Sequence, residues 1–183
     1  MSSTVQYNVG HHSRKKIRMQ VHIRTSRDDV VTVVSRKATV LSKHLREMLN
    51  DHEGEELLVH EMTSVMFGKI VEYLEHYRGC SEFSRIMRPL PSADLGKAGC
   101  NAFDVGFVKG LSKEDAKDLM LAGNYLDIPS LVELAAARIA SIIKGTSLKD
   151  LMNDAGITEF TPEWREAVRK ANPWCKAIQK SHT

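Results

Sequence analysis

One predicted helix, residues 130–144, limits the folds that this chain can adopt. Pro129 suits the first turn of a helix and Gly145 is an expected helix end, so these two residues bracket the segment. Its polar residues share one narrow stripe at spacings of three or four: Ser130, Glu133, Ser141 and Lys144, with Ala137 between them. All other positions except Arg138 are apolar, whereas a surface helix usually buries an arc of little more than about 100°. The helix is therefore either central in its own domain or half covered by another protein.

A second helix is predicted directly before it, beginning at Ser112. Ser112 and Asp115 resemble a capping box, with Asp in place of the usual Glu or Gln. Apolar residues then continue to Tyr125, and Pro129 disfavours helical geometry at Ile128. The sequence therefore predicts two consecutive helices with a break at residues 127–129.

The first part of the chain has the pattern of a small sheet with helices. Residues 18–24 alternate between apolar and polar side chains, and the β-branched stretch 30–34 follows a turn, so the two segments predict a hairpin. Residues 40–49 have helical spacing, and residues 57–59 form a third short strand. Thr63 caps a longer helix that runs to about Tyr77. We expect an α+β fold with a three-stranded sheet.

The following segment, residues 78–102, has no periodicity and is rich in Gly and Pro. A loop of this length is uncommon in a compact domain and indicates either disorder or an insertion specific to a partner. Two short helices are expected after Gly145, one starting at Ser147 and one at Thr161-Pro162.

The end of the chain carries Trp174 and Cys175. Trp has one of the largest apolar surfaces of any side chain, so leaving it in water is unfavourable. One interpretation is that Trp174 folds back on its own helix. The favoured one is that the last helices form an open apolar platform for another chain.

Composition excludes several classes of protein. Hydrophobic residues make up 42% of the 183 residues and charged residues 27%, as in ordinary globular proteins. No stretch approaches the roughly 18 apolar residues that span a bilayer, and we expect no secretory signal. The three cysteines, Cys80, Cys100 and Cys175, have no close pairing, which favours a reducing compartment.

Catalytic and metal sites are not expected either. His60-Glu61 begins like a zinc-protease motif, but Ser64 stands where the second histidine is needed. No nucleophile–base pair, phosphate-binding loop or metal-ligand spacing occurs, so the sequence predicts no enzyme, no cofactor and no metal.

The net charge of +3 comes from the N-terminal part of the chain. Six basic residues precede the first acidic one: Arg14, Lys15, Lys16, Arg18, Arg24 and Arg27. Removing these six from 26 basic residues leaves 20 against 23 acidic ones, a net charge of −3. Residues 1–16 are interpreted as a disordered basic arm. A solubilising tail is favoured over a nucleic-acid contact, which strong salt dependence of binding would reveal.

Three groups of residues closely resemble the S-phase kinase-associated adaptor family, the Skp subunit of Skp–cullin–F-box ubiquitin ligases. They are the stretch LMLAGNYLDI at 119–128, IIKG at 142–145, and FT at 160–161 followed by VRKANPWC at 168–175. The resemblance covers roughly residues 19–176. It implies a BTB/POZ-like domain at 17–127, with a flexible loop at 78–102, and a helical extension at 128–183.

The resemblance implies a non-catalytic adaptor with two faces, in the cytoplasm and nucleus. The cullin-binding face includes Asn124 and Tyr125. The F-box-binding face lies on the last helices, and its apolar contacts are expected at Val132, Ile139, Ile143, Val168, Trp174 and Cys175. A homodimer of the free chain is also allowed. The alternative is a structural partner of F-box proteins, with the same fold, in a complex that lacks both ligase function and cullin.

The chain also departs from the family pattern. Where the family has an acidic loop, residues 78–102 contain Arg78, Arg85, Arg88 and Lys97. Ser147-Leu148 replaces a frequent Thr-Pro, and Phe103 replaces a Trp. The BTB-like region, which carries the expected cullin-binding face, has diverged most from the family pattern.

Overall fold

The computed structural model describes residues 19–51, 56–80, 82–157 and 161–172. Three strands form one sheet, with a 3-10 turn (η1) at Ala38–Leu41. The strands are β1 Gln20–Thr25, β2 Val31–Ser35 and β3 Glu56–Val59. The α-helices are α1 Lys43–Asp51, α2 Ser64–His76, α3 Ala102–Val108, α4 Lys113–Tyr125, α5 Pro129–Gly145, α6 Leu148–Asp154 and α7 Pro162–Ala171. The expected α+β fold is therefore confirmed.

The sheet has the order β2-β1-β3, with β1 in the centre. β1 pairs antiparallel with β2 through Ile23 opposite Thr32, and parallel with β3 through Ile23 opposite Leu57. The predicted hairpin and the third strand are both confirmed. Because side chains alternate along a strand, Val21 and Ile23 are buried while His22 faces outward.

The predicted helix over residues 40–49 differs from the observed structure. Ser42 has an extended backbone that separates η1 from α1. Its hydroxyl donates to the carbonyl oxygen of Leu126 at 2.5 Å and accepts the amide of Leu45. Ser42 therefore caps α1 and joins it to the end of α4, which helical spacing alone does not reveal.

The other predicted helix boundaries agree with the structure. Ser112 and Asp115 complete a reciprocal capping box at the start of α4. The side chains of Thr63, Ser147 and Thr161 accept backbone amides at the starts of α2, α6 and α7. Each cap supplies a partner for an amide that lacks one inside the helix.

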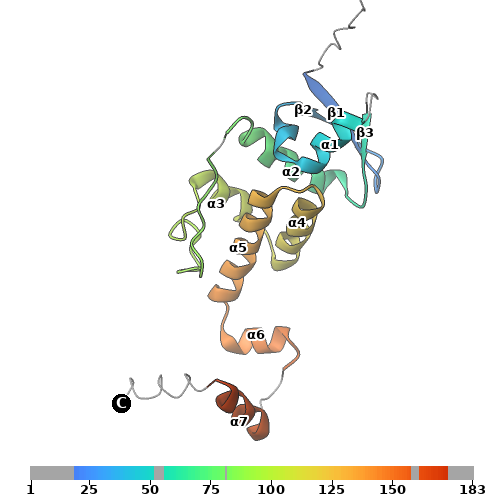
Figure 1. Ribbon diagram of the computed structural model, residues 1–183. Helices are drawn as coiled ribbons and strands as arrows, with labels where there is room; N and C mark the ends of the chain where they lie inside the picture. Colours follow the sequence, from blue (N-terminus) through green and yellow to red (C-terminus); the bar gives the residue numbers. More distant parts are fainter. Residues whose placement is uncertain (1–18, 52–55, 81, 158–160, 173–183) are drawn as a thin grey trace, which may run out of the picture.

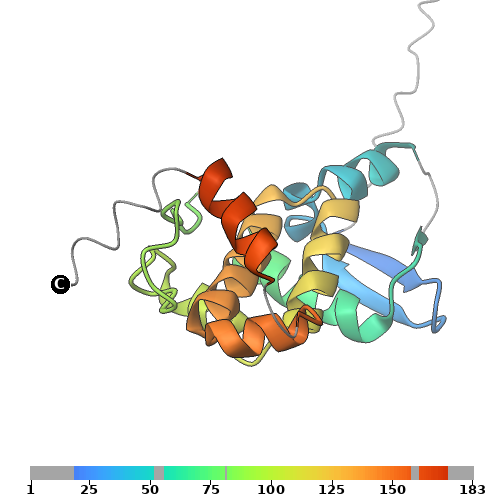
Figure 2. The same cartoon turned by 90° about the horizontal axis from the view of Figure 1, so that it is seen from below.

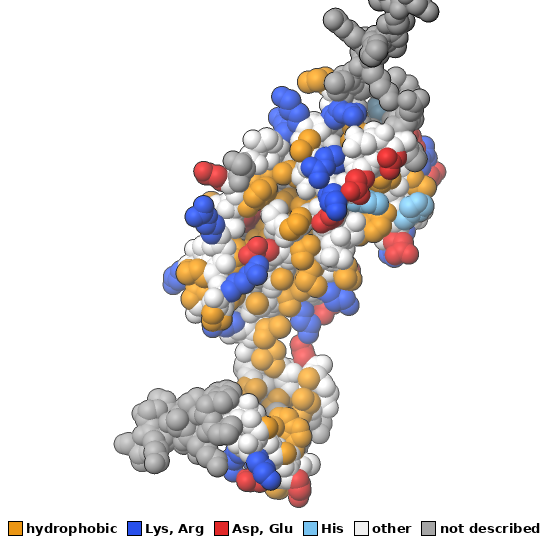
Figure 3. All heavy atoms as spheres, in the orientation of Figure 1, with side chains coloured by type: hydrophobic (Ala, Val, Ile, Leu, Met, Phe, Trp, Pro, Cys, Tyr) orange, Lys and Arg blue, Asp and Glu red, His pale blue; other side chains and the backbone are white. Residues whose placement is uncertain are grey.

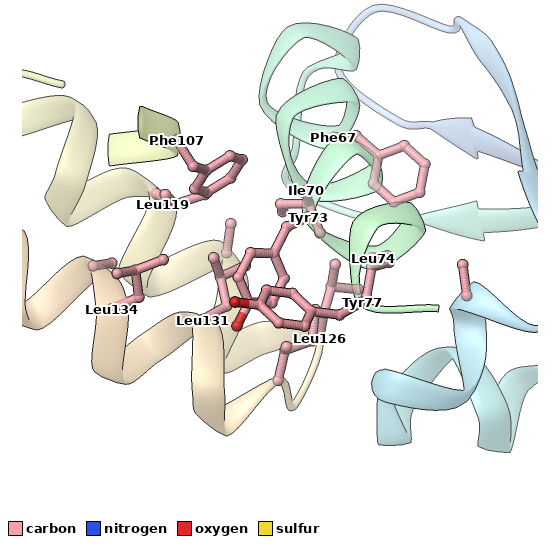
Figure 4. Close-up of a cluster of buried hydrophobic side chains, with 14 of the residues drawn as sticks. Phe67, Ile70, Tyr73, Leu74, Tyr77, Phe107, Leu119, Leu126, Leu131 and Leu134 are labelled. Atoms are coloured by element: carbon pink, nitrogen blue, oxygen red, sulfur yellow. The ribbon is translucent and has the colours of Figure 1, made fainter. Parts of the chain in front are cut away.

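The hydrophobic core lies between α2, α4 and α5 (Figure 4). α4 and α5 run side by side and make the most extensive contact between elements, as Figures 1 and 2 show. Their shared layer includes Leu119, Leu126 and Leu131, all fully buried, and Tyr73 of α2 packs on it. The sheet and α1 lie at one end of this body, and α6 and α7 extend beyond the opposite end of α5 (Figure 1).

The loop between α2 and α3 follows a defined path beside α5 in the structure. The amide of Met87 donates to the carbonyl oxygen of Ala98 at 2.9 Å, and Leu95 and Ala98 are buried. Gly99 has a φ of +99°, and a Cβ atom there would lie 2.3 Å from the carbonyl oxygen of Arg85. The chain closes on itself at this point only because Gly99 lacks a side chain. The expected flexibility of the loop stays a prediction.

Candidate interaction surfaces

One face of α5 points away from the core and is apolar. Val132, Ile139 and Ile143 recur at helical spacing on it, and Ile143 is 44% exposed. Leu131, Leu134 and Ala135 on the opposite side are buried. The structure thus brings three of the predicted F-box-binding residues onto one surface, which we call the outer face of α5.

The polar stripe of α5 faces the loop. The hydroxyl of Ser141 donates to the carbonyl oxygen of Ala93 at 2.5 Å, and Glu133 pairs with Arg88 at 2.6 Å. Ser141 and Ala137 are each only 6% exposed. The helix is therefore covered by the core on one side and by the loop on a second, and its third side is the apolar outer face.

Arg138 is the one charged residue outside that stripe. Its guanidinium donates to the carbonyl oxygen of Leu111 at 2.8 Å and to that of Lys109 at 3.3 Å. These carbonyls lie just before α4, so Arg138 fixes the start of α4 against the middle of α5.

α6 and α7 bury none of their own residues against the described part of the chain. Leu148 is 69% exposed and Trp164 is 50% exposed, while Val168 is half-buried. A hydrogen bond of 3.0 Å from Lys113 to Asp154 ties α6 to α4. Hydrophobic side chains gather where α5 ends and over α6 and α7 (Figure 3).

Two large apolar residues, Leu148 and Trp164, belong to this surface but were not among the predicted site residues. The signal available in the sequence was that a short amphipathic helix has no predicted neighbour on which to pack. Trp174 and Cys175 lie outside the described residues, so their predicted role stays a prediction.

Tyr125 lies on a different side of the molecule, at the end of α4. Its hydroxyl accepts the amide of His60 at 3.3 Å, and the His44 ring meets its ring edge-on at 5.0 Å between centroids. Tyr125 is 37% exposed and lines a hollow of about 350 Å³ together with Leu121, which is 55% exposed. This hollow is lined by the end of α4 and by the segment after β3.

Asn124 lines another hollow, which lies between the loop and the outer face of α5. Asn124 and Tyr125 were both assigned to the cullin-binding face. They line two separate hollows, because consecutive side chains on a helix diverge by about 100°. Asn124 shares its hollow with Val132, one of the predicted F-box-binding residues.

A partly buried polar network holds the base of the loop on α3. Asn101 caps α3 by accepting the amide of Asp104, and its side-chain amide donates to the Tyr77 hydroxyl at 2.7 Å. The Ser84 hydroxyl donates to Asp104 at 2.5 Å. Burial is the main reason that the pKa of Tyr77 rises to about 12, so the phenol stays protonated at neutral pH.

Neither a metal centre nor a membrane span is visible in the ranges given above. Within them no three His, Cys, Asp or Glu side chains are grouped as metal ligands would be. No helix among the described residues is long and apolar enough to cross a membrane.

A small sheet covered by helices, with a helical extension that presents exposed apolar faces, is typical of a protein-interaction module. Comparison with known proteins gives the class. Residues 129–175 match the family model described as "Skp1 family, dimerisation domain". This range spans α5 to α7 and continues past the described residues.

Individual relatives match over most of the chain. A Skp1-related protein of Caenorhabditis elegans is 29% identical over 163 residues, which cover 83% of this chain and 89% of the relative. The S-phase kinase-associated protein 1 homolog of Tetrahymena thermophila is 27% identical, covering 82% and 91%. The SCF ubiquitin ligase complex protein SKP1a of Dictyostelium discoideum is 26% identical, covering 82% and 93%. The chain is therefore similar to proteins of the Skp1 family over most of its length.

Proposed function

We propose that this chain is the adaptor subunit of a Skp–cullin–F-box ubiquitin ligase. It holds an F-box receptor on the outer face of α5 with α6 and α7, and a cullin on the Tyr125 side. It is not itself catalytic. The names of two relatives support an assembly of this kind. One is the Dictyostelium protein named above, and the other is a protein of Arthroderma benhamiae named "E3 ubiquitin ligase complex SCF subunit sconC".

The observation that carries the proposal is the exposure of α6 and α7. Helices of 7 and 10 residues are marginal on their own in water, and these two bury no residue within the described chain. Burying a Leu-sized side chain contributes about 1.5–3 kcal/mol. Covering Leu148, Ile143 and Trp164 with a partner therefore stabilises both the complex and the helices.

The proposed cullin contact rests on the hollow that Tyr125 lines. Tyr125 presents an aromatic ring whose hydroxyl already has a backbone partner, and Leu121 adds exposed apolar area beside it. Aromatic residues at the rim of such a hollow are typical anchors of protein interfaces. The proposed F-box surface lies on α5, α6 and α7, whereas the Tyr125 hollow is lined by residues of α4 and of the segment after β3, so both partners can bind together.

A pull-down from the native cell with three single variants tests the proposal. Ile143→Asp places a charge on the outer face of α5, and Tyr125→Lys places a charge at the hollow that Tyr125 lines. Val33→Asp is the matched control, because Val33 is 47% exposed on the sheet, away from both surfaces. We expect Ile143→Asp to lose F-box proteins, Tyr125→Lys to lose only the cullin, and Val33→Asp to keep both.

Other outcomes point elsewhere. F-box proteins without any cullin in the wild-type sample would favour the structural partner outside a ligase. Absence of F-box proteins from the wild-type sample would contradict the proposed function as a whole.

A further inference from the structure

A hollow of about 560 Å³ lies between α1, the loop and the first turns of α5. Its volume is within the range of natural small-molecule sites. Ser130 and Glu133 of the polar stripe belong to its α5 wall, whereas the three residues of the outer face of α5 do not line it. Asp104 of α3 also lines it, and we call this space the Asp104 hollow.

Asp104 is a buried carboxylate with one oxygen atom that has no partner. The residue is 1% exposed. Its Oδ2 accepts the Ser84 hydroxyl at 2.5 Å, but Oδ1 has no hydrogen-bond partner among the described residues. No Lys, Arg or His of that part of the chain forms an ion pair with it. A buried carboxylate is unfavourable unless a charge or a donor compensates it, so this position lacks a cationic donor.

Neighbouring groups respond to the negative charge of Asp104. The pKa of Cys100 is raised to about 11, first by burial and then by this charge. Burial is also the main cause of the raised pKa of Tyr77, and Asp104 contributes to it. Both groups would be easier to ionise if a cation lay beside Asp104.

The walls of the hollow suit an organic cation. Tyr73, which is fully buried, and Phe83, which is half-buried, contribute aromatic rings, and Ile86 and Leu134 contribute aliphatic area. The face of an aromatic ring attracts an ammonium group, more strongly where water is excluded. A bare metal ion needs several oxygen ligands, and no such group is found within the described ranges.

The other charged groups of the hollow are more exposed than Asp104. Asp127 lies 3.9 Å from Lys43, and Glu133 is paired with an arginine of the loop at 2.6 Å. Arg46 is exposed, so solvent and salt screen its charge. Among the acidic residues that line the hollow, Asp104 is therefore the one without a counter-charge in the described chain.

We propose that the Asp104 hollow binds a small organic ammonium ion with an apolar body. The ammonium group donates a hydrogen bond to Oδ1 of Asp104, and the apolar body lies against Tyr73 and Phe83. The loop, α1, α3 and α5 all border the hollow, so the bound ligand ties these segments together. This inference does not depend on the proposed function, because neither the outer face of α5 nor the hollow that Tyr125 lines takes part in it.

An NMR titration of the isotope-labelled full chain tests the proposal. The probe is phenethylamine, which joins an ammonium group to an aromatic ring. Its neutral counterpart is phenethyl alcohol, which has the same body and a hydroxyl group in place of the ammonium. We expect phenethylamine to shift the amides of Ser84, Asp104 and Ser130 with a Kd of about 1 mM, a modest affinity that suits so small a ligand. It should bind at least tenfold more tightly than phenethyl alcohol.

Asp104→Asn removes the charge and keeps the size of the side chain. Asp118→Asn is the matched control, because Asp118 is exposed on α4 and does not line the hollow. We expect Asp104→Asn to weaken phenethylamine binding at least tenfold and to change the affinity for phenethyl alcohol less than threefold. Asp118→Asn should leave both affinities unchanged.

A second pair of variants covers the case in which Asp104→Asn does not fold. Val40 is 56% exposed and lines the hollow, so Val40→Lys adds a positive charge to its wall without disturbing the core. Val65, which is 83% exposed on α2, is the matched position for the same substitution. Val40→Lys should weaken phenethylamine binding at least threefold, and Val65→Lys should not weaken it.

Equal affinities of the wild type for phenethylamine and phenethyl alcohol would show an adventitious apolar contact only and overturn the inference. Unchanged phenethylamine binding in Asp104→Asn, or in Val40→Lys where Asp104→Asn does not fold, would overturn it as well. If the wild type shows no shift of these amides at tens of millimolar phenethylamine, Oδ1 of Asp104 holds water alone and the inference fails.

Discussion

The hydroxyl of Ser141 donates a hydrogen bond of 2.5 Å to the carbonyl oxygen of Ala93. The two residues are far apart in sequence, and their contact fixes the middle of the loop near the end of α5. Together with the Arg88–Glu133 pair, it decides which sides of α5 remain available to another protein.

Replacing Ser141 with Ala should loosen the loop. The variant loses one largely buried hydrogen bond, so we expect the free energy of unfolding to fall by about 1 kcal/mol. Amides of residues 87–98 should exchange with deuterium faster than in the wild type, which mass spectrometry can follow. Unchanged exchange in this segment would show that the loop does not depend on Ser141.

Two glycines should respond in opposite directions to replacement by Ala. In Gly99→Ala the Cβ meets the Arg85 carbonyl oxygen at 2.3 Å and the φ of +99° is unfavourable, so we expect a loss of about 2 kcal/mol or more. Gly106→Ala lies inside α3, with nothing within 4 Å of the new Cβ, and should stabilise by about 0.5–1 kcal/mol. Urea denaturation measures both. Equal effects would contradict the role assigned to Gly99.

Asp28 should make the stability depend on pH in acid. The Ser64 hydroxyl, followed by the Thr25 hydroxyl and the Ser64 amide, holds the pKa of Asp28 below its ordinary value of 3.8. A carboxylate with a lowered folded-state pKa contributes stability above its unfolded pKa, and this is lost as pH falls through the folded value. In urea titrations between pH 7 and pH 3, the free energy of unfolding of Asp28→Asn should therefore fall less steeply with decreasing pH than that of the wild type. Parallel curves would exclude this contribution.

Hydrogen exchange should distinguish α6 and α7 from the body of the molecule. In the free chain their amides should exchange much faster than those of α4 and α5, because they bury no residue of their own. When an F-box segment binds, amide exchange over residues 148–154 and 162–171 should slow at least tenfold. The sheet residues 20–25 serve as the internal control and should not change. Slow exchange in the free chain would contradict the exposed platform.

Local signals in the sequence were sufficient for most helix boundaries. The capping pattern at Ser112, the Pro at position 129 and the Thr161-Pro162 start each act within one turn of the helix, so their physical effect does not depend on distant residues. The motif at 119–128 and the segments after it also carried the family resemblance, which the comparisons bear out.

The candidate surfaces were only partly predictable. The family resemblance implied contacts at Val132, Ile139 and Ile143, and the structure places these residues on the outer face of α5. The sequence contained no sign that Ile86 and Met87 of the loop face the same helix, since a segment without periodicity carries no pattern that positions it. The separation of Asn124 from Tyr125 into two hollows depends equally on neighbours that are remote in sequence.

The sequence by itself thus determined most of the elements, the caps at Thr63, Ser112, Ser147 and Thr161, and the apolar excess of α5. Only the tertiary structure decided what covers each side of that helix, since periodicity groups residues into faces but does not say which face is covered. Ser141 illustrates the difference. It reads as part of a solvent-facing polar stripe, yet it is buried because the carbonyl oxygen of Ala93, supplied by the loop, satisfies its hydroxyl.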